Sequence, residues 1–442
     1  MLLLYTHTIT PRLRYIVDFV SEELLHESIV ITDDPEAFIY TEGPRICYHH
    51  EKLSSDAFHI IPQGLLFEET IQQQKIQCFD YQNQTAFFAT TGDYPFDIFS
   101  AIFYLISRYE EYLPHQKDKF GLFDHRESLA YKASFLQKPL VNIWLDQLKS
   151  NLQQNFPEII FKRKAFNCQI TYDIDMAYSY HHKGWMRNTG AALRNIWKRN
   201  WKELVLQVNV LRGKIKDPFD CFEALDALHL YCRIKPVYFF LVAKNRSVYD
   251  KNINPASRDF QHLIEYYAGK YDIGLHPSWK SFEDAALLKE EAEWLEVIAE
   301  KTIRKSRQHY LRFSLPDTFR QLIQIGIEKE YSMGYGDTNG FRASVASPFQ
   351  WFDLQKNEST SLKIFPFCFM EATNFFETKT TPENAYRELL EYYNIVKKYH
   401  GTFITVWHNH LLGFHPETEG WRKMFELFMR HTIYWDAYSD KT

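Results

Sequence analysis

The stretch of the chain that decides its interpretation is Asn167-Cys168-Gln169-Ile170-Thr171-Tyr172-Asp173-Ile174-Asp175. Its β-prone first half predicts a buried strand, and two carboxylates follow at the strand's end. Side chains at positions i and i+2 of a strand leave the same face, so Asp173 and Asp175 should point at one spot. Two like charges held that close repel each other unless a cation lies between them. The pattern therefore predicts a metal that one carboxylate binds, while the other stays free to move protons.

Downstream of this strand, apolar β-prone runs alternate with helical segments. Seven strands in parallel, separated by helices, predict an α/β fold with a distorted parallel (β/α)7 barrel-like domain over residues 158–442. The predicted strands cover residues 168–172, 236–242, 271–275, 309–313, 331–335, 363–369 and 401–407. The predicted helices between them cover residues 218–231, 257–267, 282–305, 316–328 and 382–399.

The first part of the chain, residues 1–157, forms a separate pattern. Strands over 2–7 and 28–32 flank an amphipathic helix over 11–25, with Pro11 at its start, and this predicts an opening βαβ unit. Further strands are expected at 65–67 and 85–89, and a helix near 95–112. No catalytic constellation is visible in this part, so we expect an N-terminal α/β accessory domain whose role the sequence does not indicate.

Composition limits the class of protein. The chain has 442 residues, 17% aromatic residues and a net charge of -5, which together predict two well-packed domains and no nucleic-acid binding. Six scattered cysteines without a Cys-x-x-Cys pair fit reduced thiols and a cytoplasmic location. The longest apolar run, residues 98–107, is about half of the roughly 20 residues that a membrane span needs, so no transmembrane segment is expected.

Polar residues follow several predicted strands at the point where each strand ends. His276 follows the run 271–275, His408 follows 401–407, and His309 lies at the edge of its own run. Carboxyl ends of neighbouring parallel strands lie close enough to share one metal. Carboxylate oxygen and imidazole nitrogen, with positions left open for water and substrate, suit a catalytic divalent ion such as zinc.

These residues belong to five ordered motifs, TYDID (171–175), IGLHPSW (273–279), SRQHYLRF (306–313), DTNGFRA (337–343) and ITVWHNH (404–410). In this order they resemble the polysaccharide deacetylases, which are carbohydrate esterase family four with a NodB-homology-type domain. The resemblance covers about residues 160–442. With its N-terminal part included, the chain is similar to a divergent bacterial subgroup that carries an N-terminal accessory domain. It implies a distorted (β/α) barrel and a metal-dependent hydrolase that removes acetyl groups from amino sugars.

The resemblance also implies individual roles. Asp173 matches the general base and Asp175 the first metal ligand, while His276 matches the first histidine of the family's His-x-x-x-His motif. The sequence departs from the motif at its second histidine, where it has Lys280. The nearest replacement is His309, so the expected metal ligands are Asp175, His276 and His309, holding Zn²⁺ or, alternatively, Co²⁺, Ni²⁺ or Mn²⁺.

Three further positions have two interpretations each. Arg307 resembles the family's arginine that holds the base, and Arg342 competes for that role. His408 matches the general acid that protonates the leaving amine, with His410 on the same face as its rival. Glu371 also ends a predicted strand, where a surface or helix-capping role is the alternative.

The predicted function is a hydrolase that removes an acetyl group from an N-acetylated sugar or glycan precursor, using water activated by a divalent metal. Relatives of this fold also act on non-sugar amides, which is the first alternative. A catalytically inactive glycan-binding module is the second, and Lys280 in place of a histidine is the feature that favours it.

An insertion at about 183–216 lies outside the five motifs. It carries nine Lys or Arg against a single acid, Glu203, with Trp185, Trp197 and Trp201 interleaved, and its spacing predicts a basic amphipathic helix. One interpretation is a helix that packs its apolar face on the barrel. The other is a platform for an anionic glycan or a lipid-linked sugar, with peripheral contact to the inner membrane surface.

Overall fold

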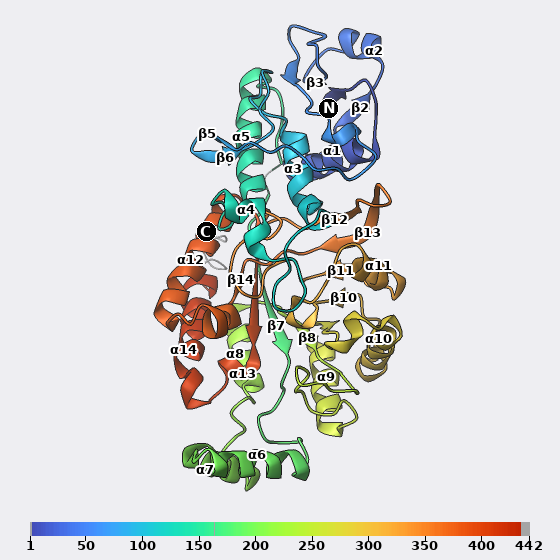
Figure 1. Ribbon diagram of the computed structural model, residues 1–442. Helices are drawn as coiled ribbons and strands as arrows, with labels where there is room; N and C mark the ends of the chain where they lie inside the picture. Colours follow the sequence, from blue (N-terminus) through green and yellow to red (C-terminus); the bar gives the residue numbers. More distant parts are fainter. Residues whose placement is uncertain (1, 163, 435–442) are drawn as a thin grey trace.

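The computed structural model describes residues 2–162 and 164–434 (Figure 1). Residues 1, 163 and 435–442, which include the end of the predicted second domain, lie outside the described residues. The chain forms two mainly parallel sheets with helices around them and a small antiparallel hairpin, so the predicted α/β class is confirmed. No helix within the described ranges combines the length and the apolar character needed to cross a membrane.

The N-terminal sheet has the strand order β2-β1-β3-β4, with every pair parallel. Thr10 caps helix α1, and Pro11 occupies its first turn, so the predicted βαβ unit is confirmed. The elements are β1 (Leu3–Tyr5), α1 (Pro11–Leu24), β2 (Val30–Thr32), α2 (Pro35–Tyr40), β3 (Arg45–Tyr48) and β4 (Phe58–Ile60).

The rest of the N-terminal part is a hairpin and helices. The strand predicted at 65–67 is wrong, because Gly64 at φ 104° starts a 3-10 turn there. The helix predicted over 95–112 ends early, since Arg108 at φ 56° breaks it. The elements are β5 (Phe79–Tyr81), β6 (Gln84–Ala86), α3 (Ile98–Ile106), η2 (Tyr109–Tyr112), α4 (Leu129–Lys132) and α5 (Leu140–Asn155).

The second sheet has nine strands in the order β12-β13-β11-β10-β9-β8-β7-β15-β14. All pairs are parallel except β12 with β13. Within the described residues no pairing joins β12 to β14, so closure into a barrel is not seen. The strands are β7 (Asn167–Ile174), β8 (Val237–Phe240), β9 (Asp272–Leu275), β10 (Lys305–Ser306), β11 (Lys329–Glu330), β12 (Phe349–Asp353), β13 (Glu358–Ile364), β14 (Phe369–Met370) and β15 (Thr402–His408).

Three predicted strands are wrong in detail. Strands β10 and β11 lie just before the predicted runs 309–313 and 331–335 and have two residues each. At 309–311 the chain forms the 3-10 turn η5 (His309–Leu311), with Tyr310 at φ 57°. Tertiary packing at the strand ends overrides the β propensity of these aromatic and branched residues. The run 363–369 divides between β13 and β14.

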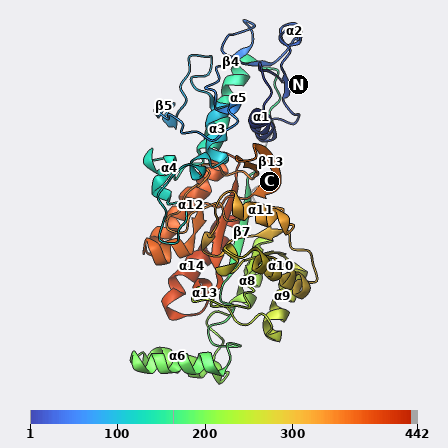
Figure 2. The same ribbon diagram turned by 45° about the vertical axis from the view of Figure 1, so that its right-hand side comes forward.

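Helices flank the large sheet on both sides, with α12 and α14 on one side and α9 and α10 on the other (Figures 1 and 2). The five predicted helices are present, with ends that differ by a few residues. The helices are α8 (Phe222–Cys232), α9 (Arg258–Lys270), α10 (Ala285–Ala299), α11 (Asp317–Gln324), α12 (Pro382–Lys398), α13 (Asn409–Leu412) and α14 (Glu419–Phe428).

The basic insertion is a helical hairpin instead of one helix. It consists of α6 (Trp185–Trp197) and α7 (Trp201–Leu211), separated by Arg199 at φ 54° and capped at α7 by Asn200. Both views show it projecting away from the remainder of the molecule (Figures 1 and 2). The interpretation that its apolar face packs on the sheet domain is wrong, because most of that face is exposed.

The two parts of the chain share a continuous apolar core and a buried ion network. Glu111 of η2 receives bonds from Arg108 at 2.8 Å and from Arg342 at 2.8 and 2.7 Å. Burial disfavours the charge of Glu111, but Arg342 and Arg108 outweigh it and lower the pKa to about 2. The carboxylate thus joins an arginine of the N-terminal part to one of the sheet domain.

Replacing this carboxylate should destabilise the protein strongly. We expect Glu111→Gln to lower the free energy of unfolding by about 3–5 kcal/mol at neutral pH, because the buried Arg342 loses its carboxylate partner and Arg108 keeps only Glu110. Because folding lowers the pKa of Glu111 from 4.5 to about 2, its carboxylate stabilises the folded protein fully above pH 4.5, and this stabilisation is lost as the pH falls through 2. Urea unfolding should therefore show that the difference in free energy of unfolding between wild type and Glu111→Gln becomes smaller below pH 4.5. Exposed Glu42→Gln is the control, and equal stability of the two variants would contradict the prediction.

Candidate metal centre

Parallel register brings the predicted residues to one edge of the large sheet. Asp173 lies at the end of β7, opposite His408 of β15. His276 directly follows β9, and Arg307 and His309 follow the short β10. Because β7, β8, β9 and β10 are successive neighbours, their carboxyl ends face one region of space.

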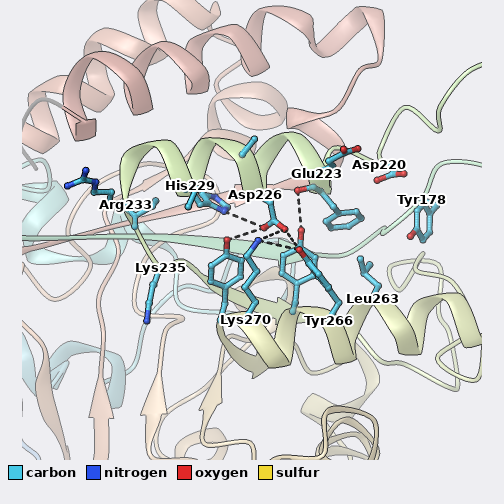
Figure 3. Close-up of a pocket in the computed structure, with 16 residues that line it drawn as sticks. Tyr178, Asp220, Glu223, Asp226, His229, Arg233, Lys235, Leu263, Tyr266 and Lys270 are labelled. Carbon is cyan, nitrogen blue, oxygen red and sulfur yellow. Dashed lines mark hydrogen bonds and ion pairs between the residues drawn. The ribbon is translucent and has the colours of Figure 1, made fainter.

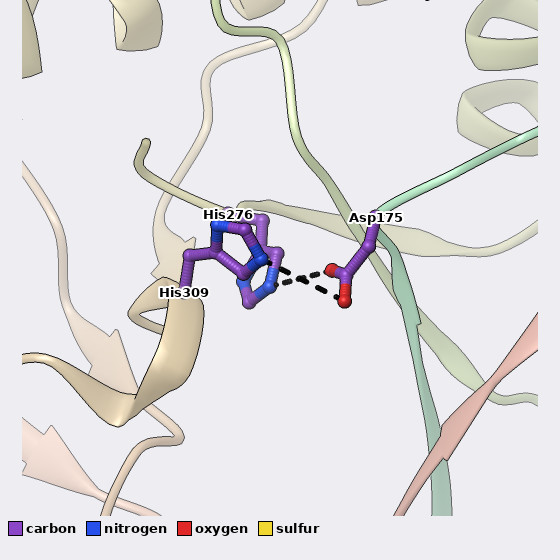
Figure 4. A group of neighbouring side chains, drawn as sticks. All are labelled: Asp175, His276 and His309. Atoms are coloured by element: carbon purple, nitrogen blue, oxygen red, sulfur yellow. Dashed lines mark ion pairs between the residues drawn. The ribbon is translucent and has the colours of Figure 1, made fainter. Parts of the chain in front are cut away.

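Asp175, His276 and His309 form one cluster there (Figure 4). The Nε2 atom of His276 lies 3.0 Å from Asp175 Oδ1, and the Nε2 atom of His309 lies 3.7 Å from Asp175 Oδ2. One ligand atom from each residue lies within 4.8 Å of the others. Both imidazoles are buried, and Asp175 is half-buried.

The opposite nitrogen of each imidazole is held by an acceptor. His276 Nδ1 lies 2.5 Å from the carbonyl oxygen of Arg307, and His309 Nδ1 lies 3.1 Å from Asp250 Oδ1. A carbonyl or carboxylate partner places the proton on Nδ1, which leaves each Nε2 lone pair free. This arrangement is typical of histidines that bind a metal through Nε2.

The residues present fit a divalent cation. Asp175 Oδ1 is buried and takes part in no hydrogen bond, although it lies beside His276 Nε2. Two ligands at about 2.1 Å from a tetrahedral ion lie about 3.4 Å apart, and the separations of 3.0 and 3.7 Å are close to that value. Two imidazoles and one carboxylate also leave coordination positions for water and substrate.

The electrostatics of the cluster favour a cation. Burial disfavours the charge of Asp175, but His309 and His276 outweigh it and hold its pKa well below the usual range. Burial also lowers the pKa of His309, yet Asp175 and Asp250 raise it to about 9. The carboxylates that retain a proton on this imidazole would equally stabilise a divalent ion in its place.

Asp173 lies beside the cluster and is held by Arg307. Arg307 Nη1 donates to Asp173 Oδ1 at 2.9 Å and to Thr171 Oγ1 at 2.7 Å, and its Nε donates to the carbonyl of Tyr331 at 3.0 Å. The other carboxylate oxygen of Asp173 lies 3.9 Å from His276 Nε2. Asp173 is therefore fixed next to the cluster with one oxygen turned toward it.

His408 flanks the cluster from β15, with its Nε2 3.8 Å from Asp175 Oδ2. Its Nδ1 lies 3.2 Å from Glu371 Oε1, and its backbone N–H donates to the same oxygen at 2.5 Å. Burial lowers the pKa of His408, but Glu371 outweighs this effect and raises it to about 9. The pKa of the neighbouring His410 shifts in the opposite direction, because burial and His408 lower it to about 3.

Other predicted residues lie elsewhere. The guanidinium of Arg342 bonds to Glu111 and to the carbonyl of Gly334, so the arginine on Asp173 is Arg307 and the alternative role for Arg342 is wrong. Lys280 is exposed in the short 3-10 turn η4 (Lys280–Phe282). Glu371 is fully buried on His408, so the surface role is wrong, while its carboxylate also accepts from the backbone N–H groups of Ala372 and His408 at two helix starts, in keeping with the capping role.

Sequence reasoning missed Asp250 altogether. It lies in the loop after β8, far from any of the five motifs, and its carboxylate accepts from Ser247 Oγ at 2.6 Å and from the N–H of Trp279 at 2.9 Å. Its only visible signal is an acidic residue in a long loop at a strand's carboxyl end. Such loops carry many acidic residues, so this signal does not single it out.

Two other groups of polar side chains lie outside this cluster. Asp124, His125 and Asp337 also lie close together, but the Asp124 carboxylate is already paired with Arg126. A cavity of about 810 Å³ lies between α8 and α9 (Figure 3). Its central carboxylate, Asp226, pairs with Lys270 at 2.7 Å and accepts from two tyrosine hydroxyls, so this carboxylate is already engaged within the protein.

Residues 2–157 match the model of a family described as "Family of unknown function (DUF7033)". No curated protein matches the chain. Solved structures that resemble it include a protein from Mycobacterium smegmatis named for the polysaccharide deacetylases, with 13% identity and a TM-score of 0.39 over 62% of this chain and 86% of that one. Another, from Pseudomonas aeruginosa and named likewise, has 9% identity and a TM-score of 0.38 over 61% and 85%.

A polysaccharide deacetylase from Bacillus cereus has 11% identity and a TM-score of 0.30 over 61% of this chain and 88% of its own. Likenesses this weak carry no argument about activity. The case for function therefore depends on the geometry of the cluster itself.

Metal retention tests the cluster directly. We expect zinc-loaded wild-type protein to keep about one ion per chain through gel filtration, and Asp175→Ala, His276→Ala and His309→Ala each to lose it, because three protein ligands are needed for a stable site. Metal content would be measured by mass spectrometry. Exposed His262→Ala and Lys280→Ala are the controls and should retain zinc. Unchanged retention in His309→Ala would show that this histidine is no ligand.

Proposed function

We propose that this protein is a metal-dependent hydrolase that removes an acetyl group from an N-acetylated sugar or glycan precursor. The observation that carries the proposal is the group of Asp175, His276 and His309, with Asp173 and His408, which are neighbours on β7 and β15, both beside it. A metal site with a base and an acid next to it is what amide hydrolysis needs.

Zinc is the proposed ion, and its chemistry when bound is to lower the pKa of water and to polarise a carbonyl oxygen. Asp175, His276 and His309 would hold it. Their orientation depends on Asp250 and on the carbonyl of Arg307, which fix the two imidazole rings.

The remaining residues would move the protons. Asp173, oriented by Arg307, would accept a proton from the attacking water as the new C–O bond forms. His408, charged through its contact with Glu371, would donate a proton to the amide nitrogen as the C–N bond breaks. The products are acetate and a free amine, and the two residues exchange a proton afterwards to restore the starting state.

Aromatic side chains beside the cluster suggest where a sugar would lie. Tyr310 is 39% exposed, and its ring centre lies 4.6 Å from that of His309. Trp279 stacks on Tyr249 at 3.9 Å and contacts Tyr310 at 5.4 Å, and Phe120 from the N-terminal part completes the group. Exposed rings of this kind bind the apolar faces of sugars.

Acetate release from acetylated amino-sugar oligomers tests the reaction. We expect zinc-loaded wild-type protein to release acetate and Asp173→Asn to lower kcat by about 10²–10⁴-fold, because the base is lost. The same variant should keep its zinc, which separates a base from a metal ligand. Metal-loaded protein that hydrolyses only non-sugar amides would favour the alternative substrate class, and protein that binds glycan but no metal would favour the inactive module.

Tyr310 should affect binding more than chemistry. We expect Tyr310→Ala to raise KM for an oligosaccharide about five- to tenfold with a small change in kcat, because a stacking surface is lost without moving the base or the acid. Tyr310→Phe keeps the ring and should behave like wild type. An equal effect of both variants would indicate a role for the hydroxyl and contradict stacking.

A further inference from the structure

The hairpin of α6 and α7 leaves most of its large apolar side chains exposed. Val210 of α7 is buried, but so are the polar Asn195 and Gln207, with Gln207 only 1% exposed and donating to the carbonyl of Asn188 at 2.8 Å. In contrast, Trp185 is 78% exposed and Trp197 is 82% exposed. A helix pair in water normally buries its apolar face, so this degree of exposure is unusual.

The exposed apolar residues are continuous along both helices. On α6 they recur at positions 185, 186, 193, 196 and 197, a spacing that places them on one side of the helix. The full exposed set is Trp185, Met186, Leu193, Ile196, Trp197, Trp201, Val205, Leu211 and Ile215. Such a patch is rare on a monomeric soluble protein and indicates a surface that something covers.

The charge of the hairpin indicates what covers it. Residues 183–216 carry nine Lys or Arg and one acid, whereas the whole chain has a net charge of -5. The acid, Glu203, is already engaged with Tyr180 and with His415 at 3.2 Å. Within the described part of the chain, six exposed basic side chains of this region make no ion pair: Arg194, Lys198, Arg199, Lys202, Arg212 and Lys214. The surface is therefore apolar and strongly cationic at once.

The hairpin is firmly connected to the candidate metal centre. Asp217, fully buried at the hairpin's exit, accepts from the backbone N–H groups of Ser179, Tyr180 and His181 at its entrance, at 2.7–2.9 Å. Arg187 of α6 donates to the carbonyl of Asn252 at 3.0 Å. The entrance itself follows β7 directly after Asp175, so the hairpin projects from the edge of the sheet where the candidate site lies (Figure 1).

We propose that the hairpin of α6 and α7 is a peripheral membrane-docking element that binds anionic lipid bilayers. Its Trp, Leu, Met and Val side chains enter the interface between headgroups and acyl chains, and the surrounding Lys and Arg contact the anionic headgroups. Tryptophan is the side chain best suited to this depth, because its ring is apolar and its N–H needs a polar partner.

The size of the hairpin fits this position. Helix α6 has 13 residues and α7 has 11, which gives lengths of about 20 and 17 Å. Neither helix reaches across a hydrocarbon core of about 30 Å, so both lie along the surface. This inference deepens the proposed function, and if that function also holds, the substrate of the candidate site is carried on the bilayer to which the hairpin binds. Vesicle binding does not depend on that activity and is tested separately.

Vesicle cosedimentation of the full chain tests the proposal. We expect binding to vesicles of phosphatidylcholine with about 30% phosphatidylglycerol, at least about tenfold weaker binding to phosphatidylcholine alone, and weakening with added salt. Trp185→Ala/Trp197→Ala/Trp201→Ala should reduce the affinity for the anionic vesicles by at least about tenfold, because the inserted rings are lost. Tyr40→Ala, equally exposed but in the N-terminal part, should bind like wild type.

A second variant separates charge from apolar insertion. We expect Arg194→Glu/Lys198→Glu/Lys202→Glu to lose more than tenfold in affinity and to abolish the preference for anionic lipid. A control with two charge reversals, Arg14→Glu/Lys75→Glu, changes exposed basic residues elsewhere and should not affect binding. Lipids brominated on their acyl chains should quench the tryptophan fluorescence of wild type and quench the triple-tryptophan variant much less.

Two outcomes would overturn the proposal. One is equal binding of wild type and both hairpin variants, which would place any membrane contact elsewhere. The other is absence of binding to both kinds of vesicle. If the protein then forms a concentration-dependent dimer that the tryptophan substitutions abolish, the partner of the hairpin is a second copy of the chain. Acetate release is measured in parallel with soluble oligomers, so a failed deacetylase assay leaves the vesicle result interpretable.

Discussion

The buried guanidinium of Arg307 holds both halves of the candidate site together. Its side chain fixes Asp173, and its own carbonyl oxygen fixes His276. A fully buried arginine is costly to desolvate unless its charge and its N–H groups are satisfied. Asp173 balances the charge, and Asp173, Thr171 and the carbonyl of Tyr331 accept from Nη1 and Nε, whereas the buried Nη2 makes no hydrogen bond. The guanidinium carbon also lies 4.6 Å from the ring centre of Phe239. The position of the proposed base is therefore coupled to the orientation of a proposed metal ligand through one residue.

Local pattern was enough to find the parallel strands β7, β8, β9 and β15 and the residues at their ends. The β7 run and its two carboxylates are visible because period-two geometry and burial leave a direct trace in the sequence. The resemblance to the polysaccharide deacetylases implied the cluster of Asp175, His276 and His309, and the structure brings the three residues together. That they bind a metal stays a prediction.

What the sequence could not reveal depends on contacts between distant segments. Arg342 resembles a site residue locally, yet its partner, Glu111, lies 231 residues away. Glu371 and Asp250 orient two histidines from loops and strand ends that no local pattern connects to them. At Tyr310 a turn replaces the strand that β propensity predicts. The exposure of the α6–α7 hairpin is a matter of tertiary packing, which the sequence of the hairpin alone does not determine. The N-terminal part, which places Phe120 against Tyr310 and Trp279, likewise acquires a place at the site only in three dimensions.

The central claim is that one divalent ion is bound between Asp175, His276 and His309. An anomalous-difference map from a crystal soaked in zinc, recorded on both sides of the zinc absorption edge, tests it most directly. The account predicts a single strong peak about 2.0–2.2 Å from one carboxylate oxygen of Asp175 and from the Nε2 atoms of both histidines. A peak at Asp124, His125 and Asp337 alone, or a map without a peak beside Asp175, would contradict it.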